Sequence, residues 1–305
     1  MEIRPYHPND YNDIVELCKF IWEGNDYLPS TINQYYEEEH CRPYILLEGG
    51  KVVSVCNAHF YTKDFVWLEA MRTHPDYRSK GLASKLSEKI LKDSVKIGTK
   101  EAWLSTSSNN QATAKMLGKS GFQEMFRMKV WGFGSTEIDE TELSTNKGII
   151  DGSLVTSRYL DENIPDSVKG TQNDWRAITN IAELESSKKT IPFLFSEFMI
   201  CPIESHFIPE WIEKGYILKN IKTNSLMTLK ESKEENGMYI VGISDTNKEN
   251  VLSALYFAYK KVESILKNSD LTGIKPNLSL FFHNDVDIEI FHNSWIFRIM
   301  RKKLS

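Results

Sequence analysis

The sequence predicts an α/β protein with a mixed β-sheet. Two β-rich runs, 44–47 and 51–60, flank Gly49-Gly50, which is typical of a β-hairpin. A strand-like run at 65–73 is then followed by helical spacing at 82–95 and by a further strand-like run at 102–106. At 305 residues the chain exceeds one typical domain, so we expect two domains, each with its own core.

The other expected elements of the first half follow from periodicity and turn residues. They are an edge strand at 3–6, a helix with apolar positions Tyr11, Ile14, Leu17, Cys18, Ile21 and Trp22 that ends at Gly24, a turn at 25–30, a helix at 32–39, a short helix from Ala112 and a strand opened by Gly121-Phe122.

A change of composition divides the chain. Residues 134–148 are rich in Ser, Thr, Glu and Asp and poor in large apolar residues, which indicates a linker. We therefore expect domains at 1–134 and 151–305, joined by a linker at 135–150. In the second half, the expected elements are a helix ending at Gly215, strands at 225–229 and 238–243, a helix from Asn250 and closing strands at 278–282 and 295–300.

Composition excludes several classes of function. A net charge of −5 gives no reason to expect nucleic acid or an anionic membrane as partner. No apolar run is long enough to span a bilayer, and no signal peptide is visible, so we expect a cytoplasmic protein. The four cysteines contain no Cys-x-x-Cys pair and the seven histidines no ligand spacing, so we expect reduced thiols and no metal.

The most informative stretch is the exit of the strand at 65–73. Pro75 ends this strand, and Arg78-Ser79-Lys80-Gly81-Leu82-Ala83 then opens a helix. Gly81 lets the backbone approach a ligand, and the helix N-terminus offers unpaired N–H groups to an anion such as a pyrophosphate. The alternative is an ordinary turn before a surface helix.

This stretch resembles the acyl-CoA motif of the GNAT acetyltransferase superfamily, Gln/Arg-x-x-Gly-x-Gly/Ala. The resemblance implies the GNAT fold and acetyl-CoA as co-substrate, with no metal. The cofactor-binding residues that it implies are Met71, Arg72, Thr73, Arg78, Ser79, Lys80, Gly81, Leu82, Ala83, Ser84, Asn109 and Asn110. Asn109 and Asn110 have an alternative role, which is to cap the following helix.

Acetyl transfer to an amine needs a base, and Glu69 is the candidate catalytic residue. The alternative is a structural carboxylate paired with Arg72 or Arg78. A strand bulge near 71–73 would supply an oxyanion-binding N–H. No general acid is assigned, because Leu117 stands where many superfamily members carry Tyr.

Beyond its first half, the chain is similar to two-domain proteins related to histidine N-acetyltransferase. The shared features are Asp26-Tyr27-Leu28-Pro29-Ser30, Glu69 before Met71-Arg72-Thr73, Asp174-Trp175 and a strand containing Tyr239.

This resemblance implies transfer to a small amine, an amino acid above all, without fixing which one. Asp26 and Tyr27 are the implied substrate residues, although Tyr27 could equally be a core aromatic. The second half, compatible with a degenerate GNAT-like unit, lacks the CoA motif; we expect it to bind no CoA and to shape the acceptor pocket. Two alternatives remain, a protein or peptide acetyltransferase and a non-catalytic acyl-CoA sensor. Nothing in the sequence sets the oligomeric state.

Overall fold

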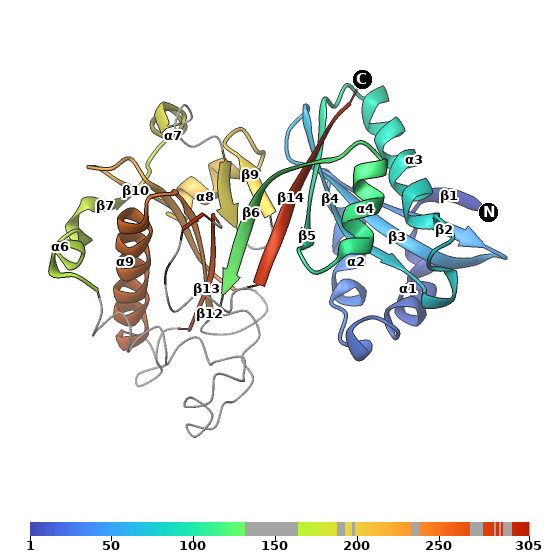
Figure 1. Ribbon diagram of the computed structural model, residues 1–305, viewed down its shortest axis with the longest axis horizontal. Coiled ribbons are helices and arrows are strands. Elements are labelled where there is room, and N and C mark those ends of the chain that lie inside the picture. The colour runs from blue at the N-terminus through green and yellow to red at the C-terminus, as the bar shows by residue number, and fades with distance from the viewer. Residues whose placement is uncertain are drawn as a thin grey trace. The chain divides into compact units, whose positions relative to one another are not determined.

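The computed structural model describes residues 1–131, 164–187, 193–196, 199–232, 238–268, 277–283, 285–286, 288 and 295–304. They form two compact units (Figure 1). Unit 1 comprises the described residues within Met1–Thr106, Asn110–Met125 and Ile299–Ser305, and unit 2 those within Ser107–Asn109 and Phe126–Arg298. No helix in these ranges is both long and apolar enough to cross a membrane.

Unit 1 contains a mixed sheet with helices on both faces. Its elements are β1 (Glu2–Pro5), η1 (Pro8–Asp10), α1 (Tyr11–Cys18), η2 (Trp22–Gly24), α2 (Leu28–Glu37), β2 (Cys41–Glu48), β3 (Lys51–Phe60), β4 (Phe65–Thr73), η3 (Pro75–Tyr77), α3 (Leu82–Lys96), β5 (Glu101–Ser107) and α4 (Gln111–Lys119). The strands lie in the order β1-β2-β3-β4-β5, antiparallel up to β4, whereas β4 and β5 are parallel.

Each face of this sheet has its own core, because side chains alternate along every strand. α3 and α4 pack on one face, where Leu82, Leu86 and Leu117 join residues such as Leu46 and Leu68. α1 and α2 pack on the other face with the apolar cluster Tyr6, Ile14, Leu17, Cys18, Ile21, Leu28, Ile32, Ile45, Leu47, Val52, Val55 and Ala70.

The first two helices differ from their expected bounds. α1 ends at Cys18, before the expected end at Gly24, because Trp22 and Glu23 adopt positive φ angles of 45° and 58° that no helix continues. α2 begins at Leu28, inside the expected turn at 25–30, since Pro29 is tolerated in the first turn of a helix.

Unit 2 is also an α/β structure. The described elements that lie wholly or partly in it are β6 (Gln123–Trp131), α6 (Asp166–Lys169), η5 (Gln172–Asp174), β7 (Trp175–Ala177), α7 (Ile181–Ser187), β8 (Phe193–Ser196), β9 (Met199–Pro202), α8 (Ile208–Glu213), β10 (Ile217–Asn220), β11 (Leu226–Glu231), β12 (Met238–Ser244), α9 (Lys248–Lys267), β13 (Asn277–His283) and β14 (Trp295–Lys303). Residues 123–125 of β6 and 299–303 of β14 are grouped with unit 1.

The sheet of unit 2 has the order β6-β13-β12-β11-β10-β7. The apolar side of α9 packs on β11, β12 and β13 through residues such as Val251, Leu255 and Val262. β12 and β13 are parallel and joined through α9, just as β4 and β5 are joined through α3. Unit 2 therefore repeats the order of antiparallel strands, helix and parallel strand that unit 1 uses.

The C-terminal end of the chain returns to unit 1. Leu304 N donates to Lys100 O at 2.7 Å, and Met300 is buried in the core beneath α3 and α4. Lys302 Nζ donates to Ser120 O at 2.7 Å. The sequence places residues 299–304 in a second domain starting at 151, whereas the structure groups them with unit 1. The expected boundary at 134 and the linker at 135–150 lie outside the described residues.

Candidate functional site

The parallel ladder between β4 and β5 is short. It joins Phe65 to Glu101, Val66 to Ala102 and Trp67 to Trp103, and includes no later pair. Within the described strands, residues 68–73 of β4 therefore have a ladder partner only in β3. Main-chain groups that no strand satisfies are available to a ligand that lies along β4.

A β-bulge interrupts β4 at this point. Val55 pairs with Arg72 and Asn57 with Glu69, so Ala70 and Met71 together lie opposite Cys56. Ala70 has a φ angle of 54°, in the left-handed region. Since strand side chains alternate, the extra residue lets both Glu69 and Ala70 point to the face that α1 and α2 cover. The bulge thus lies at Ala70 and Met71, next to the region 71–73 near which the sequence predicts it.

Glu69 is held by two side chains of β3. Asn57 Nδ2 donates to Glu69 Oε1 at 2.8 Å, and His59 Nδ1 lies 3.5 Å from the same oxygen. Asn57 is fully buried, whereas the side chain of Glu69 is 20% exposed. Oε1 is thus engaged by side chains of β3. We find no ion pair between Glu69 and Arg72 or Arg78 among the described residues.

Sequence reasoning missed Asn57 and His59. Their contact with Glu69 follows from the β3–β4 register, in which Asn57 is the direct partner of Glu69. The available signal was an amide in an otherwise apolar strand, since a buried polar side chain requires a partner.

The loop before α3 forms the second part of the site. Ser79 and Gly81 have positive φ angles of 61° and 74°, and Gly81 is the N-cap of α3. No side chain caps this end of α3 in the described part of the chain, and a Cβ on Gly81 would meet no atom within 4 Å. Alternating backbone conformations of this kind, at a helix N-terminus, direct N–H groups toward an anion.

Two cations flank this loop. Arg78 is exposed and its Nε donates to Thr73 O at 3.2 Å, which ties the loop to the end of β4. Lys80 is exposed and its Nζ lies 4.6 Å from the centre of the Tyr77 ring. Both side chains are therefore accessible to a phosphate group of a ligand bound at this loop.

The other residues expected to bind the cofactor take different positions. Leu82 is buried in the core, whereas Ala83 and Ser84 are partly exposed in the first turn of α3. Met71 packs against the same core as Leu82, and Thr73 Oγ1 lies 2.9 Å from Ser54 Oγ. Any contact of Met71 or Thr73 with a cofactor along β4 would therefore involve main-chain groups above all.

The Asn109-Asn110 loop has a capping role. Asn110 Oδ1 accepts a hydrogen bond from Thr113 N at 3.1 Å and caps α4. Asn109 is exposed, and its N–H donates to Ser107 Oγ at 3.3 Å. The position of the missing general acid, Leu117, is buried in the core and offers no proton.

Asp26 and Arg72 form a buried ion pair. Arg72 Nε donates to Asp26 Oδ2 at 2.6 Å and Nη2 to Oδ1 at 3.0 Å, while Oδ1 also accepts from Leu28 N at 3.1 Å. The side chain of Asp26 is fully buried and that of Arg72 is 10% exposed. The carboxylate of Asp26 is thus occupied within the protein, and the guanidinium of Arg72 is not directed to a phosphate.

Two aromatic rings pack against the guanidinium of this ion pair. The Arg72 guanidinium lies 4.5 Å from the centre of the Trp22 ring and 5.3 Å from that of Tyr27. Both rings are exposed, so they present an aromatic edge to solvent beside Arg72. Burial lowers the pKa of Arg72, whereas its hydrogen bonds to Asp26 raise it. The net result is a pKa above the ordinary value of arginine.

The described residues of unit 2 show neither an early end of a parallel ladder nor an uncapped helix after it. β12 and β13 pair over six residues, from Met238–Asn277 to Ile243–Phe282, so their ladder has no early end. The helix that follows β12 is capped by Asn247, whose side chain accepts from Asn250 N at 3.1 Å. A Cβ on Gly242 would lie 1.7 Å from Phe195 O, so β8 packs directly on this strand.

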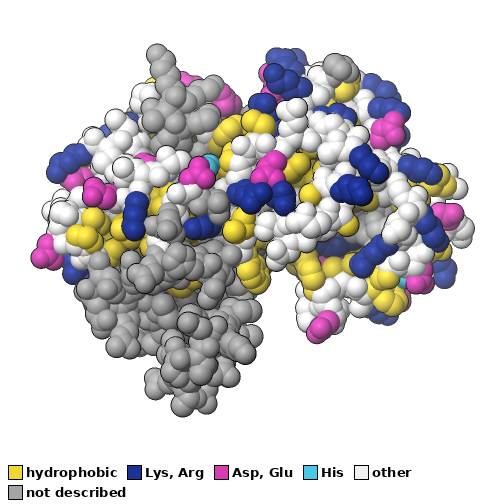
Figure 2. Space-filling view, viewed as in Figure 1, with side chains coloured by type: hydrophobic (Ala, Val, Ile, Leu, Met, Phe, Trp, Pro, Cys, Tyr) yellow, Lys and Arg dark blue, Asp and Glu magenta, His cyan; other side chains and the backbone are white. Residues whose placement is uncertain are grey.

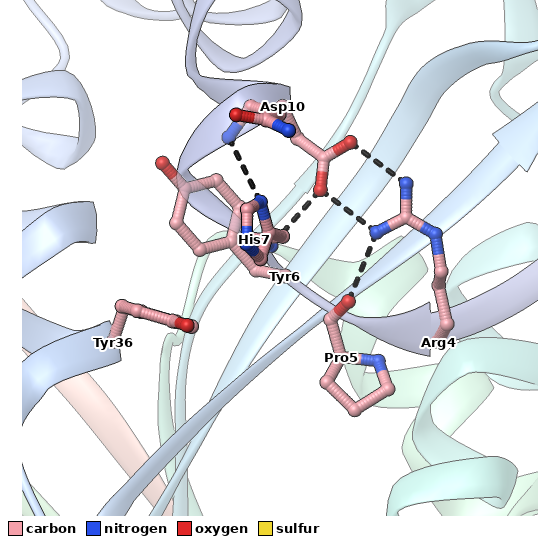
Figure 3. Close-up of a pocket in the computed structure, with 7 residues that line it drawn as sticks. Arg4, Pro5, Tyr6, His7, Asp10 and Tyr36 are labelled. Carbon is pink, nitrogen blue, oxygen red and sulfur yellow. Dashed lines mark hydrogen bonds and ion pairs between the residues drawn. The ribbon is translucent and has the colours of Figure 1, made fainter.

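A surface hollow elsewhere in unit 1 is lined by Arg4, Pro5, Tyr6, His7, Asn9, Asp10 and Tyr36. Figure 3 shows that its polar groups bind one another, with Arg4 Nη2 at 2.7 Å from Asp10 Oδ1 and His7 N donating to Asp10 Oδ2 at 2.9 Å. These bonds join β1 to η1 and hold the pKa of Asp10 below its usual range, chiefly through Arg4. The hollow is therefore a structural junction.

The face drawn in Figure 2 carries both basic and acidic side chains. On the face drawn in Figure 2, basic side chains are interspersed with acidic and uncharged ones. On α3, Lys92 pairs with Glu88 at 2.7 Å, and both Lys89 and Lys96 pair with Asp93. The lysines of α3 thus form a solvated, ion-paired helix face.

A family model matches part of unit 1. Residues 10–122 match the model of the acetyltransferase (GNAT) family. This match spans the sheet from α1 to the end of α4 and includes Glu69 and the Gly81 loop. A search of curated proteins finds no match.

Several solved structures align with this chain, one of them over nearly its whole length. A putative acetyltransferase from Thermoplasma acidophilum aligns over 99% of this chain and 100% of its own, with a TM-score of 0.53 and 10% identity. The ribosomal-protein-S18-alanine N-acetyltransferase from Escherichia coli aligns over 44% of this chain and 84% of its own, with a TM-score of 0.39 and 19% identity. An acetyltransferase from Streptococcus agalactiae aligns over 41% and 84%, with a TM-score of 0.36 and 23% identity.

The predicted mixed α/β class and the GNAT fold are therefore confirmed, although residues 10–122 are only part of the chain. With the short β4–β5 ladder and the open loop before α3, the family match leads to one conclusion: residues 10–122 of this chain form an acetyltransferase domain of the GNAT family.

Proposed function

We propose that the protein transfers the acetyl group of acetyl-CoA directly to the amine of a small molecule, an amino acid such as histidine, within a ternary complex. The observation that carries this proposal is the position of Glu69. It lies directly before the β4 bulge, where the ladder to β5 has already ended, and its carboxylate is held in place by Asn57.

The cofactor would lie along β4 with its pyrophosphate at the loop before α3. The N–H groups around Ser79 and Gly81 would bind the phosphate oxygens, with Arg78 and Lys80 adding charge. The pantetheine arm would pair with the main chain of 68–73, which β5 leaves unpaired. A main-chain N–H at the bulge would stabilise the oxyanion.

The reaction then proceeds in balanced steps. The neutral amine nitrogen attacks the thioester carbon and forms the new C–N bond, and Glu69 accepts the proton that the nitrogen loses. Collapse of the tetrahedral intermediate breaks the C–S bond and releases the thiolate of CoA. Because Leu117 offers no proton, water protonates the thiolate, which is a tolerable leaving group near neutral pH.

Unit 2 would serve acceptor selection without binding CoA itself. Three observations support the absence of CoA binding by the described part of unit 2: the full-length β12–β13 ladder, the capped start of α9 and the close packing of Phe195 on Gly242. A small polar acceptor requires a pocket closed on most sides to be oriented for attack.

The test is an acceptor screen with the full-length protein. Acetyl-CoA is incubated with single amino acids, polyamines and a peptide with a free amino terminus, and release of the CoA thiol is measured together with the mass of the acetylated product. Acetylation of one amino acid far above the others supports the proposal. Acetylation of the peptide alone favours an open groove, and binding of acetyl-CoA without any product favours a sensor.

Glu69→Gln separates catalysis from binding. The variant keeps an oxygen for the Asn57 hydrogen bond, so it should fold and bind acetyl-CoA, while turnover falls by about 10²-fold. The deficit should shrink as the pH rises, because the acceptor amine is then already neutral. Glu48→Gln, at the exposed end of β2, is the matched control. Wild-type turnover of Glu69→Gln at neutral pH would reduce Glu69 to a structural carboxylate.

A further inference from the structure

A second group of polar side chains lies next to Glu69, on the same face of the sheet. Cys41, the first residue of β2, is the direct ladder partner of His59 in β3. Glu38 follows the last turn of α2, three residues before Cys41. The β2–β3 register thus brings together a thiol, an imidazole and a carboxylate that are up to 21 positions apart in the sequence.

The three side chains have the spacing of a metal site. One potential ligand atom from each lies within 4.8 Å of the other two, and Cys41 Sγ is 3.2 Å from Glu38 Oε2. Tetrahedral zinc with bonds of about 2.0–2.3 Å places its ligand atoms about 3.3–3.8 Å apart. Side-chain adjustments of about an ångström, within the reach of Glu38 on the surface, complete this geometry.

We propose that Glu38, Cys41 and His59 bind a zinc ion. A thiolate together with imidazole nitrogen and one carboxylate oxygen suits zinc, whereas magnesium and calcium require oxygen ligands alone. The Cys41 thiol loses its proton on binding, and Glu38, which accepts the S–H hydrogen bond, provides the route of that proton to solvent. No oxidation or reduction is involved.

The local charge favours a cation. The carboxylate of Glu38 has Oε2 3.2 Å from Cys41 Sγ, and that of Glu69 has Oε1 3.5 Å from His59 Nδ1, so both place negative charge beside the cluster. The same negative field attracts a divalent cation, which in turn lowers the cost of the thiolate. Asn57 Nδ2 donates a hydrogen bond to Cys41 Sγ at 3.5 Å, a contact that a thiolate would also accept.

Neighbouring groups supply a second layer around the ion. His59 Nδ1 lies 3.5 Å from Glu69 Oε1, an arrangement in which a carboxylate orients an imidazole whose other nitrogen binds the metal. Asn57 is fully buried, and among the described residues its Oδ1 has no hydrogen-bond partner. A water molecule in the fourth coordination position would satisfy this oxygen.

The sequence predicts no metal because the ligands lack a recognisable spacing. They meet only through the ladder between two strands. The inference is independent of the acetyl-transfer proposal, since metal binding is measured without acetyl-CoA or acceptor.

The test uses the full-length protein, freed of metal with a chelator and titrated with Zn²⁺ and with Co²⁺ as a spectroscopic probe. We expect one equivalent of either metal, a sulfur-to-cobalt charge-transfer band and a rise in the thermal midpoint with Zn²⁺. Cys41→Ser should abolish the band and weaken zinc binding by about 100-fold or more. Cys201→Ser, which removes another buried thiol, should leave both unchanged.

His59→Gln gives a second, independent variant, and far-ultraviolet circular dichroism checks that each variant folds. It should keep the cobalt–sulfur band, with altered d–d transitions, and lose zinc affinity. Absence of binding to the wild-type protein, or unchanged zinc affinity in folded Cys41→Ser, would overturn the proposal.

Discussion

Asp26→Asn tests whether Asp26 serves the substrate or the fold. The sequence points to an acceptor contact, whereas the structure shows its carboxylate accepting two hydrogen bonds from Arg72 and one from Leu28 N. The amide oxygen of Asn can retain one of these bonds. Its NH₂ group, however, would face the guanidinium of Arg72, which then loses its counter-charge.

The expected cost is large because the pair is buried. Removing one partner of a buried ion pair costs about 3–5 kcal/mol, compared with about 5–15 kcal/mol for the whole free energy of unfolding of a domain. Contact with the rings of Trp22 and Tyr27 stabilises the cation by about 0.5–2 kcal/mol per ring and does not replace the lost carboxylate. We therefore expect a marginally stable variant.

The assay is urea unfolding followed by fluorescence, together with acceptor kinetics at a temperature where the variant is folded. Asp76→Asn is the control, because its exposed carboxylate lies 3.9 Å from His74 and contributes little. We expect a lower unfolding midpoint for Asp26→Asn and no change for Asp76→Asn. Unchanged stability with only a raised KM for the acceptor would refute the structural role and restore Asp26 as a substrate residue.

Three further predictions concern the loop, the C-terminal strand and a buried thiol. Gly81→Val should weaken acetyl-CoA binding, measured by calorimetry, by about tenfold or more. Gly50→Val, at another positive φ angle, is the control and should bind acetyl-CoA as the wild-type protein does. Equal acetyl-CoA affinities of the two variants would remove the loop from the site. A chain ending at residue 298 loses the buried side chains of Ile299 and Met300, and the burial of each contributes about 1.5–3 kcal/mol to the free energy of unfolding. It should therefore unfold at a lower temperature than a chain ending at 304. Equal thermal midpoints would contradict the assignment of this segment to unit 1. Burial and the nearby Asp26 raise the pKa of Cys18 to about 12, compared with about 8.5 in the unfolded chain. The contribution of the neutral thiol to stability is therefore full below about pH 8.5 and declines as the pH rises toward 12. Native Cys18 should resist alkylation at pH 8, and rapid labelling would disprove this.

Local signals predicted many elements well. Helical spacing from Asn250 and the apolar runs at 238–243 and 278–282 correspond to α9, β12 and β13 within a few residues. Gly215 follows α8 with a φ angle of 68°, as expected for a glycine at this position. These features depend on side-chain periodicity and backbone conformation within one segment, which is why sequence reasoning reaches them.

Contacts that depend on pairing between distant segments could not be predicted from the sequence. The ion pair between Asp26 and Arg72 joins residues 46 positions apart, and its burial makes it structural. Asn57 and His59 reach Glu69 only through the β3–β4 register. No periodicity within one strand reports what the neighbouring strand places opposite it.

The sequence by itself determined the α/β class, most of the succession of elements in the first half and the glycine loop at 78–83, because hydrophobic period, turn residues and a left-handed glycine are local properties of the chain. Only the tertiary structure decided that the strand at 299–303 completes unit 1, that the bulge at Ala70 directs Glu69 and Arg72 to one face, and that Glu38, Cys41 and His59 converge. Register and strand order are set by the burial of apolar faces among distant segments, a balance that depends on the whole fold.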